Sequence, residues 1–279
     1  LKPPTKAGLN QWPEYAPTIW SGMTLGAWWQ TLSQEGFAVD PRWYGRAGLM
    51  FLSGALNSAL AVADRSYYGT VGPAQGRLEE AVFIIGHWRT GTTFMHELLA
   101  AHRDFAAPTT YQVFAPAHFR LSQKWMAPLI GRAIPAIRPQ DNTELGILRP
   151  QEDEFAINSL GIKGPTRAFG FPRRHLASTD SLFASTADVG ATWKDPWLTF
   201  ARRFASSVPN HRPLFKSPGH TARIGSDGRG AAAHRLHQGD AKRLVPAGQN
   251  EKMRCANFVT HPSGIDRAKQ VDMPPQPQI

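Results

Sequence analysis

Residues 81–93 read AVFIIGHWRTGTT, and this stretch decides the fold that we expect for the chain. Its first five residues are all apolar, which is typical of a strand covered on both faces, as in a parallel sheet. After the loop, Phe94, Leu98 and Ala101 recur with helical spacing. The backbone amides of residues 87–93 would therefore point at an anion near the helix N-terminus. Strand, glycine turn, helix and hydroxyl groups together predict a phosphate-binding loop.

The positive charge of this loop lies in an unusual place. A nucleotide-hydrolysing loop reads Gly-x-x-x-x-Gly-Lys-Ser/Thr, whereas Thr92 occupies the lysine position here. The cation lies inside the loop instead, at Arg89, whose guanidinium can fork onto phosphate or sulfate oxygens. This pattern disfavours an ordinary ATPase or GTPase. A P-loop kinase or NTPase stays an alternative, as does a glycine turn that binds nothing.

The loop resembles that of the sulfotransferases that use 3'-phosphoadenosine 5'-phosphosulfate (PAPS). Their loop runs Gly-x-x-Arg/Lys-Ser/Thr-Gly-Thr-Ser/Thr, and the chain matches every fixed position. The resemblance implies an α/β fold, with a P-loop NTPase-like parallel sheet flanked by helices. It also implies that Arg89 stabilises the charge that develops as the sulfuryl group leaves. The residues that would bind the 5'-phosphosulfate are Gly86, His87, Trp88, Arg89, Thr90, Gly91, Thr92 and Thr93.

Residues 149–156, RPQEDEFA, place three carboxylates side by side. A first helical turn is one explanation, because the helix dipole favours acidic side chains there. A catalytic base is another, because sulfuryl transfer to a hydroxyl requires one, and similar acidic clusters occur in the resembled family. We expect Glu152 or Glu154, rather than Asp153, to be this base. Residues two apart on a helix face different ways, so only one of the two should face the site.

Residues 213–223, PLFKSPGHTAR, predict a strand that ends in a loop. Open α/β sheets bind their ligands at such strand ends. Lys216 could stabilise charge on the leaving phosphate, and His220 could orient or deprotonate the acceptor hydroxyl. The resemblance covers this segment too, since related enzymes carry Lys-x-Pro-x-His downstream of the acidic cluster. A surface loop with ordinary basic residues is the alternative.

The N-terminal third is expected to be helical. Residues 20–35 have the apolar spacing of an amphipathic helix, and Pro41 should start a second helix that runs through Leu60. The apolar stretch 47–60 is short for a membrane span. We prefer a helix packed on the catalytic core, and an interfacial helix near lipid-linked substrates is the alternative. No signal peptide pattern precedes it, so we expect a cytoplasmic protein, with membrane association left open.

The sequence changes character from Gly225 onward. It becomes rich in Gly, Ala, Arg, His, Gln and Pro without helical or strand periodicity. The resembled family places the Arg and Ser that bind the nucleotide 3'-phosphate in this region, and neither can be matched. We therefore expect a truncated or frame-shifted C-terminus, for example by a one-base slip after Ile224, and impaired activity. The expected divisions are a helical extension (1–77), an incomplete sulfotransferase-like P-loop α/β domain (78–224) and an irregular or disordered tail (225–279).

Length and net charge restrict the kinds of ligand that we expect this chain to bind. The chain has 279 residues and a net charge of +10, which suits an anionic nucleotide. The basic residues are dispersed and no nucleic-acid-binding motif accompanies them, so we expect no nucleic acid partner. The resemblance implies PAPS as co-substrate, adenosine 3',5'-bisphosphate as product, no metal, and a hydroxyl or amine acceptor on a small molecule, carbohydrate or lipid. A noncatalytic membrane-associated protein is the remaining alternative.

Overall fold

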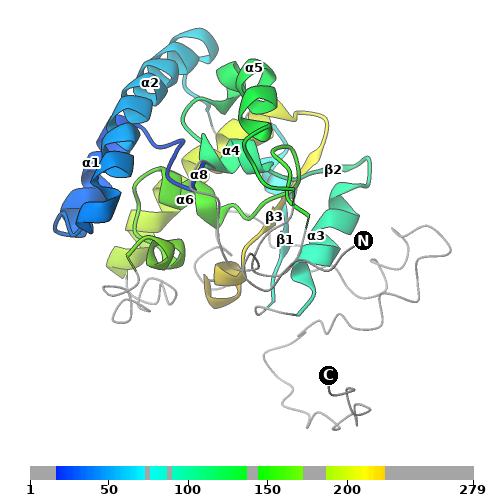
Figure 1. Cartoon of the computed structure of the whole chain (residues 1–279). Helices are drawn as coiled ribbons and strands as arrows, with labels where there is room; N and C mark the ends of the chain where they lie inside the picture. The colour runs from blue at the N-terminus through cyan, green and yellow to red at the C-terminus, as the bar shows by residue number, and fades with distance from the viewer. Residues whose placement is uncertain (1–16, 73–75, 87–89, 137–143, 172–186, 224–279) are drawn as a thin grey trace, which may run out of the picture.

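A parallel sheet of three strands lies at the centre of the fold. The computed structural model of the chain describes residues 17–72, 76–86, 90–136, 144–171 and 187–223 (Figure 1). The strands run in the order β1 (Val82–Ile84), β3 (Arg212–Lys216) and β2 (Phe105–Ala106), and all pairs are parallel. Helices cover the sheet, which confirms the α/β class that the loop sequence predicts.

The two longer strands align their carboxyl ends. Val82 pairs with Leu214 and Ile84 pairs with Lys216, so the phosphate-loop segment and the Lys-Ser-Pro segment leave the sheet at the same edge. The first strand is shorter than the predicted 81–85, because its pairing with β3 covers only three residues. The motifs that the sequence singles out therefore converge on the edge where such sheets bind ligands.

Helix α3 (Thr92–Ala100) follows the loop and covers one face of the sheet. Its Met95 and Leu99 pack with Val82, Ile84 and Leu214 in one buried cluster. Gly91 caps the helix with φ of 82°, a conformation that favours glycine. A side chain at Gly86 would place its Cβ only 2.7 Å from Thr92 Cγ2. The backbone conformation thus favours glycine at Gly91, and the nearby Thr92 side chain leaves no room for a Cβ at Gly86.

The opposite face of the sheet carries the larger core. Phe83 and Phe215 point to this side, where they meet Trp197 and Phe204 of helix α8 (Ala187–Ser207). The remaining elements around this core are η3 (Leu78–Glu80), α4 (Thr110–Phe114), α5 (Phe119–Gly131), α6 (Glu154–Ser159), η4 (Pro165–Phe169) and η6 (Pro218–Arg223).

The helices predicted for residues 20–35 and from Pro41 through Leu60 are both present among the described residues 17–72, with different bounds. Helix α1 (Leu25–Gln34) lies against α2 (Tyr44–Tyr68), which the 3₁₀ turn η2 (Pro41–Trp43) introduces (Figure 1). Asp64 ties α2 to the rest of the protein. Its carboxylate accepts hydrogen bonds from Arg120 and Arg203, both at 2.6 Å, and from the amide of Leu121 at 3.1 Å.

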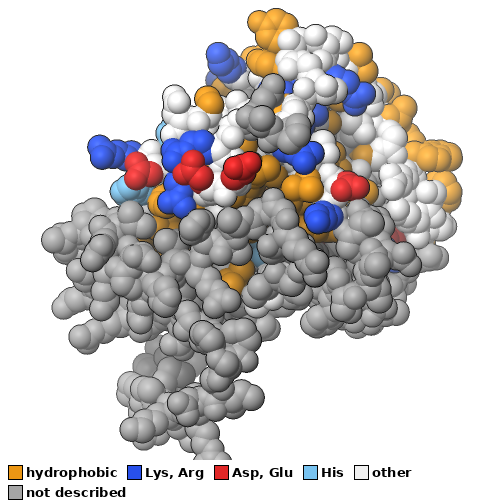
Figure 2. Space-filling view, turned by 180° about the vertical axis from the view of Figure 1, so that it is seen from behind, with side chains coloured by type: hydrophobic (Ala, Val, Ile, Leu, Met, Phe, Trp, Pro, Cys, Tyr) orange, Lys and Arg blue, Asp and Glu red, His pale blue; other side chains and the backbone are white. Residues whose placement is uncertain are grey.

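Helix α2 packs through a narrow side only. Its buried residues are Gly54, Asn57 and Asp64, whereas Leu49, Leu52 and Leu56 are 60%, 71% and 53% exposed. Figure 2 shows hydrophobic side chains along this edge of the molecule. Within the described residues, the segment Pro41–Tyr68 is long and apolar enough to cross a membrane by length and composition. The polar anchors Asn57 and Asp64, however, fix the helix to the protein.

Candidate active site

The loop between β1 and α3 begins with a tether to η6. The Gly86 amide donates to Thr221 Oγ1 at 2.9 Å, and the same hydroxyl donates to the Gly86 carbonyl at 3.2 Å. Thr90, Gly91, Thr92 and Thr93 lie where the loop enters α3, while His87, Trp88 and Arg89 lie outside the described residues. The sequence gives no sign of Thr221, because a lone threonine in a loop carries no pattern.

Lys216 brings a cation to the first turn of α3. Its Nζ donates to Thr93 Oγ1 at 3.1 Å and forms an ion pair with Glu152. The residue is only 3% exposed, at the end of the central strand. A P-loop would carry its lysine at the position of Thr92. Here an ammonium group reaches the start of the same helix from the neighbouring strand.

The three adjacent carboxylates point to three different places. Glu152 meets Lys216, and Asp153 accepts a hydrogen bond from Trp197 Nε1 at 2.6 Å and lies 2.7 Å from His220 Nε2. The Glu154 carboxylate lies against Gly164, at the start of η4. The sequence predicts that Glu152 and Glu154 diverge because both would lie on a helix. They do diverge, but for another reason, since α6 begins only at Glu154 and Glu152 precedes it.

Asp153 and His220 form a buried pair between the start of α6 and η6. Their side chains are 0% and 1% exposed. Burial raises the pKa of Asp153, but the charge of His220 and the hydrogen bonds from His220 and Trp197 outweigh it and lower the pKa overall. His220 also lies edge-on to the rings of Phe83 and Trp193. This packing orients the imidazole and gives Asp153, which the sequence ranks last of the three carboxylates, a defined partner.

His96 joins this group, although the sequence does not single it out. It lies one turn after Thr93 in α3 and is 2% exposed. Burial, followed by the charge of Lys216, lowers its pKa to about 4, so the imidazole is neutral at physiological pH. A histidine on an apolar helix face has the pattern of a core residue. Its spacing of three from Thr93 is the signal that places both on one face.

A small polar cavity connects these groups. Its volume is about 20 Å³, and its walls include Thr93, His96, Glu152 and Lys216. Such a space holds about one water molecule. Among the residues that the structure describes, no cluster of three His, Cys, Asp or Glu side chains could hold a metal ion. The cavity therefore brings together the Lys216 ammonium, the Arg149 guanidinium, the neutral His96 imidazole, the carboxylates of Glu97, Glu144 and Glu152, and the hydroxyls of Thr93 and Thr110.

Comparison with known proteins identifies a family. A family model described as the sulfotransferase family matches residues 81–226, about half of the chain. Two curated relatives, from Mycobacterium bovis and Mycobacterium tuberculosis, are both named omega-hydroxy-beta-dihydromenaquinone-9 sulfotransferase Stf3. Each is 33% identical over 220 residues, which cover 77% of this chain and 56% of the relative. The chain thus spans little more than half the length of the curated relatives that it matches.

A solved structure shows a more distant likeness. It is the crystal structure of sulfotransferase STF1 from Mycobacterium tuberculosis, with a TM-score of 0.39 and 16% sequence identity. The alignment covers 76% of this chain and 60% of the STF1 chain. The family match contains the loop, the acidic cluster and the Lys216 segment together. It ends at residue 226, next to the change in composition at Gly225.

Proposed function

This chain belongs to the sulfotransferase family, and we propose that it moves a sulfuryl group from PAPS to an acceptor hydroxyl or amine. One observation carries the proposal. Lys216 from the central strand, Glu152 from the acidic cluster and Thr93 from the loop helix meet at the carboxyl edge of the sheet. A cation, a carboxylate and hydroxyls beside amides at a helix N-terminus are what transfer of a sulfuryl group from a phosphate requires.

In the proposed reaction the acceptor oxygen attacks sulfur, and the bond from sulfur to the 5'-phosphate oxygen breaks. Glu152, whose side chain is 24% exposed, accepts the proton of the acceptor. Lys216 and Arg89 stabilise the negative charge on the departing adenosine 3',5'-bisphosphate. The loop residues Gly86, Thr90, Gly91, Thr92 and Thr93, with His87 and Trp88, hold the 5'-phosphosulfate.

The remaining predicted residues take supporting roles in this scheme. His220 lies 2.7 Å from Asp153 and is 1% exposed, so its first role is to position the segment after β3. Glu154 is buried, with its amide bonded to Ser217 Oγ at 3.3 Å, and it stands as the second candidate base. The neutral His96 beside Lys216 adds no positive charge of its own to the cavity, which Arg149 also lines.

The test is calorimetric titration of the full chain with adenosine 3',5'-bisphosphate and, separately, with ATP. Selective binding of the bisphosphate that is lost in Arg89→Ala supports the proposal. Arg103→Ala is the matched control, because Arg103 lies beyond the far end of α3 with its side chain 91% exposed. Absence of binding by a folded wild-type chain would overturn the proposal. Magnesium-dependent ATP turnover would favour the kinase or NTPase alternative instead.

The acceptor class follows from the relatives and from α2. The curated relatives are named for a menaquinone derivative, a lipid-like molecule. We infer that this chain also acts on a lipid and approaches a membrane surface through residues 47–60, because Leu49, Leu52 and Leu56 are exposed there. Co-sedimentation with anionic lipid vesicles, lost in Leu52→Ser/Leu56→Ser, would support this membrane contact. Equal co-sedimentation of the wild type and this variant would contradict it.

The proposed activity is limited by the C-terminal segment. Residues 225–279, which lie outside the described part of the chain, offer no match for the Arg and Ser that bind the 3'-phosphate in the family. Each missing contact is a charge-assisted hydrogen bond worth about 1.5 to 3 kcal/mol. Sequencing the genomic DNA tests the frame shift. A second reading frame that restores those residues supports it, and a frame that lacks them overturns it.

A further inference from the structure

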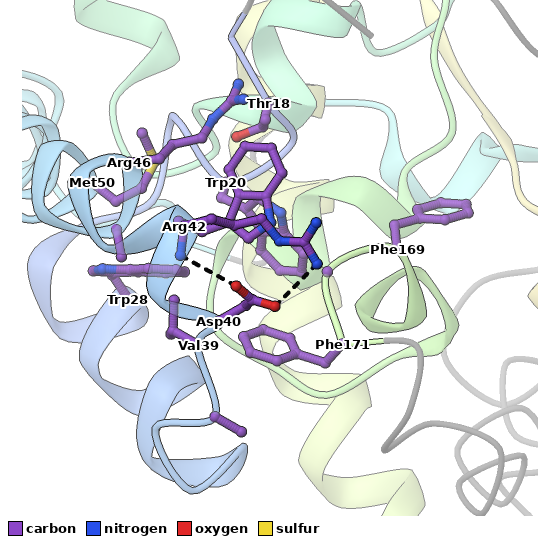
Figure 3. Close-up of a pocket in the computed structure, with 14 residues that line it drawn as sticks. Thr18, Trp20, Trp28, Val39, Asp40, Arg42, Arg46, Met50, Phe169 and Phe171 are labelled. Carbon is purple, nitrogen blue, oxygen red and sulfur yellow. Dashed lines mark hydrogen bonds and ion pairs between the residues drawn. The ribbon is translucent and has the colours of Figure 1, made fainter. Parts of the chain in front are cut away.

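A large pocket lies between the N-terminal helices and η4, on the far side of α6 from Lys216. Its volume is about 790 Å³, within the range of sites for small organic ligands. Most of its wall is aromatic or aliphatic, including Trp20, Trp28, Trp43, Met50, Phe169 and Phe171 (Figure 3). Walls of this kind bind extended apolar molecules by area and ring contacts.

The charged groups of this pocket are few and two of them are paired. Arg42 donates to the Asp40 carboxylate through Nη2 at 3.0 Å and through its amide at 3.2 Å. Arg46 lies over the ring of Trp43 at 6.0 Å, and its charge leaves the pocket with a net positive sign. Figure 3 shows the Asp40–Arg42 pair among the aromatic side chains. The polar part of an occupant should therefore be rich in oxygen acceptors.

Helix α6 connects this pocket with the candidate active site. At its first residue, the Glu154 amide bonds to Ser217 Oγ, next to Lys216. At its last residue, Ser159 Oγ donates at 3.2 Å to the carbonyl of Ile19, the neighbour of Trp20. A helix of six residues is about 9 Å long. The pocket and the small cavity at Lys216 share no lining residue, so α6 separates them by about this distance.

The outer wall of the pocket continues into the exposed face of α2. Arg46, Ala47 and Met50 line the pocket, while Leu49 and Leu52 of the same turns face outward and are 60% and 71% exposed. Adjoining apolar side chains on an exposed face mark a binding surface. The pocket is thus continuous with the face that we propose to contact lipid.

We propose that this pocket, centred on Trp20 and Phe171, holds the apolar chain of a lipid acceptor. The inference rests on the proposed sulfotransferase function and names where its acceptor is held. The aromatic wall binds the chain, and the charge of Arg46 favours an acceptor that carries oxygen atoms next to its chain.

The test is direct binding of a fluorescent fatty acid, 11-(dansylamino)undecanoic acid, to the full chain, followed by energy transfer from tryptophan. Geranylgeraniol, a prenyl alcohol, serves as an unlabelled competitor. Ala47→Phe places a ring inside the pocket from α2 and should weaken probe binding about tenfold or more. Ala55→Phe is the matched control, because Ala55 is exposed on the same helix outside the pocket, and it should stay within about twofold.

A second pocket variant keeps the inference testable if Ala47→Phe does not fold. Phe169 is 73% exposed, so Phe169→Ser removes a wall of the pocket with little effect on stability. Weaker binding in both pocket variants, with competition by geranylgeraniol, supports the inference. Wild-type binding by folded Ala47→Phe or Phe169→Ser overturns it. Adenosine 3',5'-bisphosphate binding is measured in parallel on the wild-type chain. If the folded wild type binds the probe but not the nucleotide, the sulfotransferase proposal is refuted; if it binds the nucleotide but not the probe, the pocket inference is refuted.

Discussion

The carboxyl edge of the sheet and the aromatic pocket beside the N-terminal helices hold their charged groups in different surroundings. At the sheet edge, Lys216 and Asp153 are buried and paired, and the cavity between the side chains is about 20 Å³. At the helix pair, Arg42 has its side chain 71% exposed, and apolar walls enclose about 790 Å³. Buried charges need specific partners, whereas an apolar pocket tolerates variation in its ligand. Substitutions at the sheet edge should therefore lower the stability and the catalytic activity of the protein. Substitutions at the helix pair should instead change which ligands the pocket binds.

The largest effect is expected at Asp153. Asp153→Ala removes the carboxylate that His220 and Trp197 Nε1 contact in a buried place. Removal of one member of a buried pair costs about 3 to 5 kcal/mol in the free energy of unfolding. Urea denaturation measures this loss. Asp104→Ala, with a side chain 58% exposed, is the control and should change stability by less than about 0.5 kcal/mol. Equal stability of the two variants would contradict the expectation that buried, paired charges at the sheet edge contribute more to stability than exposed ones.

Lys216 tests the chemical side of the same region. Lys216→Met removes the ammonium group that contacts Thr93 and Glu152, and sulfuryl transfer should fall by about 10² to 10³. Turnover with PAPS and a prenyl alcohol is the measurement. Lys163→Met, at an exposed position, is the matched control and should keep wild-type turnover. Retained activity in folded Lys216→Met would remove this residue from the mechanism.

The pH dependence of stability separates the buried histidines from the exposed surface. His96 and His118 each have a pKa lowered to about 4, chiefly by burial, against 6.5 in the unfolded chain. The unfolded state therefore binds protons first, and the stabilisation present above pH 6.5 is lost as the pH falls from 6.5 towards 4. The loss should reach a few kcal/mol. Urea denaturation at several pH values should show a flatter profile for His96→Gln, and an unchanged slope would contradict the assignment.

The smallest effect on stability is expected on α2. Leu52 and Leu56 are 71% and 53% exposed, so Leu52→Ser/Leu56→Ser should change the free energy of unfolding by less than about 0.5 kcal/mol. Leu99→Ala, at a site 1% exposed in the sheet region, should cost about 2 to 5 kcal/mol. Thermal unfolding compares the two. A loss above about 1 kcal/mol in the α2 variant would show that this face is covered by other parts of the chain.

Local patterns predict the elements of this fold, and pairing across the sheet arranges them. The apolar run at 81–85 and the helical spacing after Thr93 are enough to place β1 and α3. The Lys-Ser-Pro segment at the end of an apolar run also marks Lys216 as a candidate from its sequence alone. Its contact with Glu152 depends on the register of β3 against β1, which no local pattern encodes. Binding of PAPS by the loop stays a prediction, and Arg89 lies outside the described residues.

Two features could not be predicted for physical reasons. Thr221 acts through a single hydroxyl, and such side chains are common in loops. The aromatic pocket arises where residues 39–50 meet residues 169–171, far apart in the sequence. Each tryptophan there has the pattern of an ordinary core residue in an amphipathic helix. Whether a pocket forms between two elements depends on how these elements pack against each other. The amino-acid composition alone does not determine this packing.

The hydrogen bonds that Asp64 accepts from three residues have a consequence for the orientation of α2. A helix held at one point by Arg120, Arg203 and the Leu121 amide cannot turn about its own axis without uncovering a buried carboxylate. The same stripe of α2 therefore faces outward in every copy of the protein. All copies of the protein that bind a flat surface through this stripe would therefore have the same orientation. Their sheet edges would lie at the same height and angle above that surface.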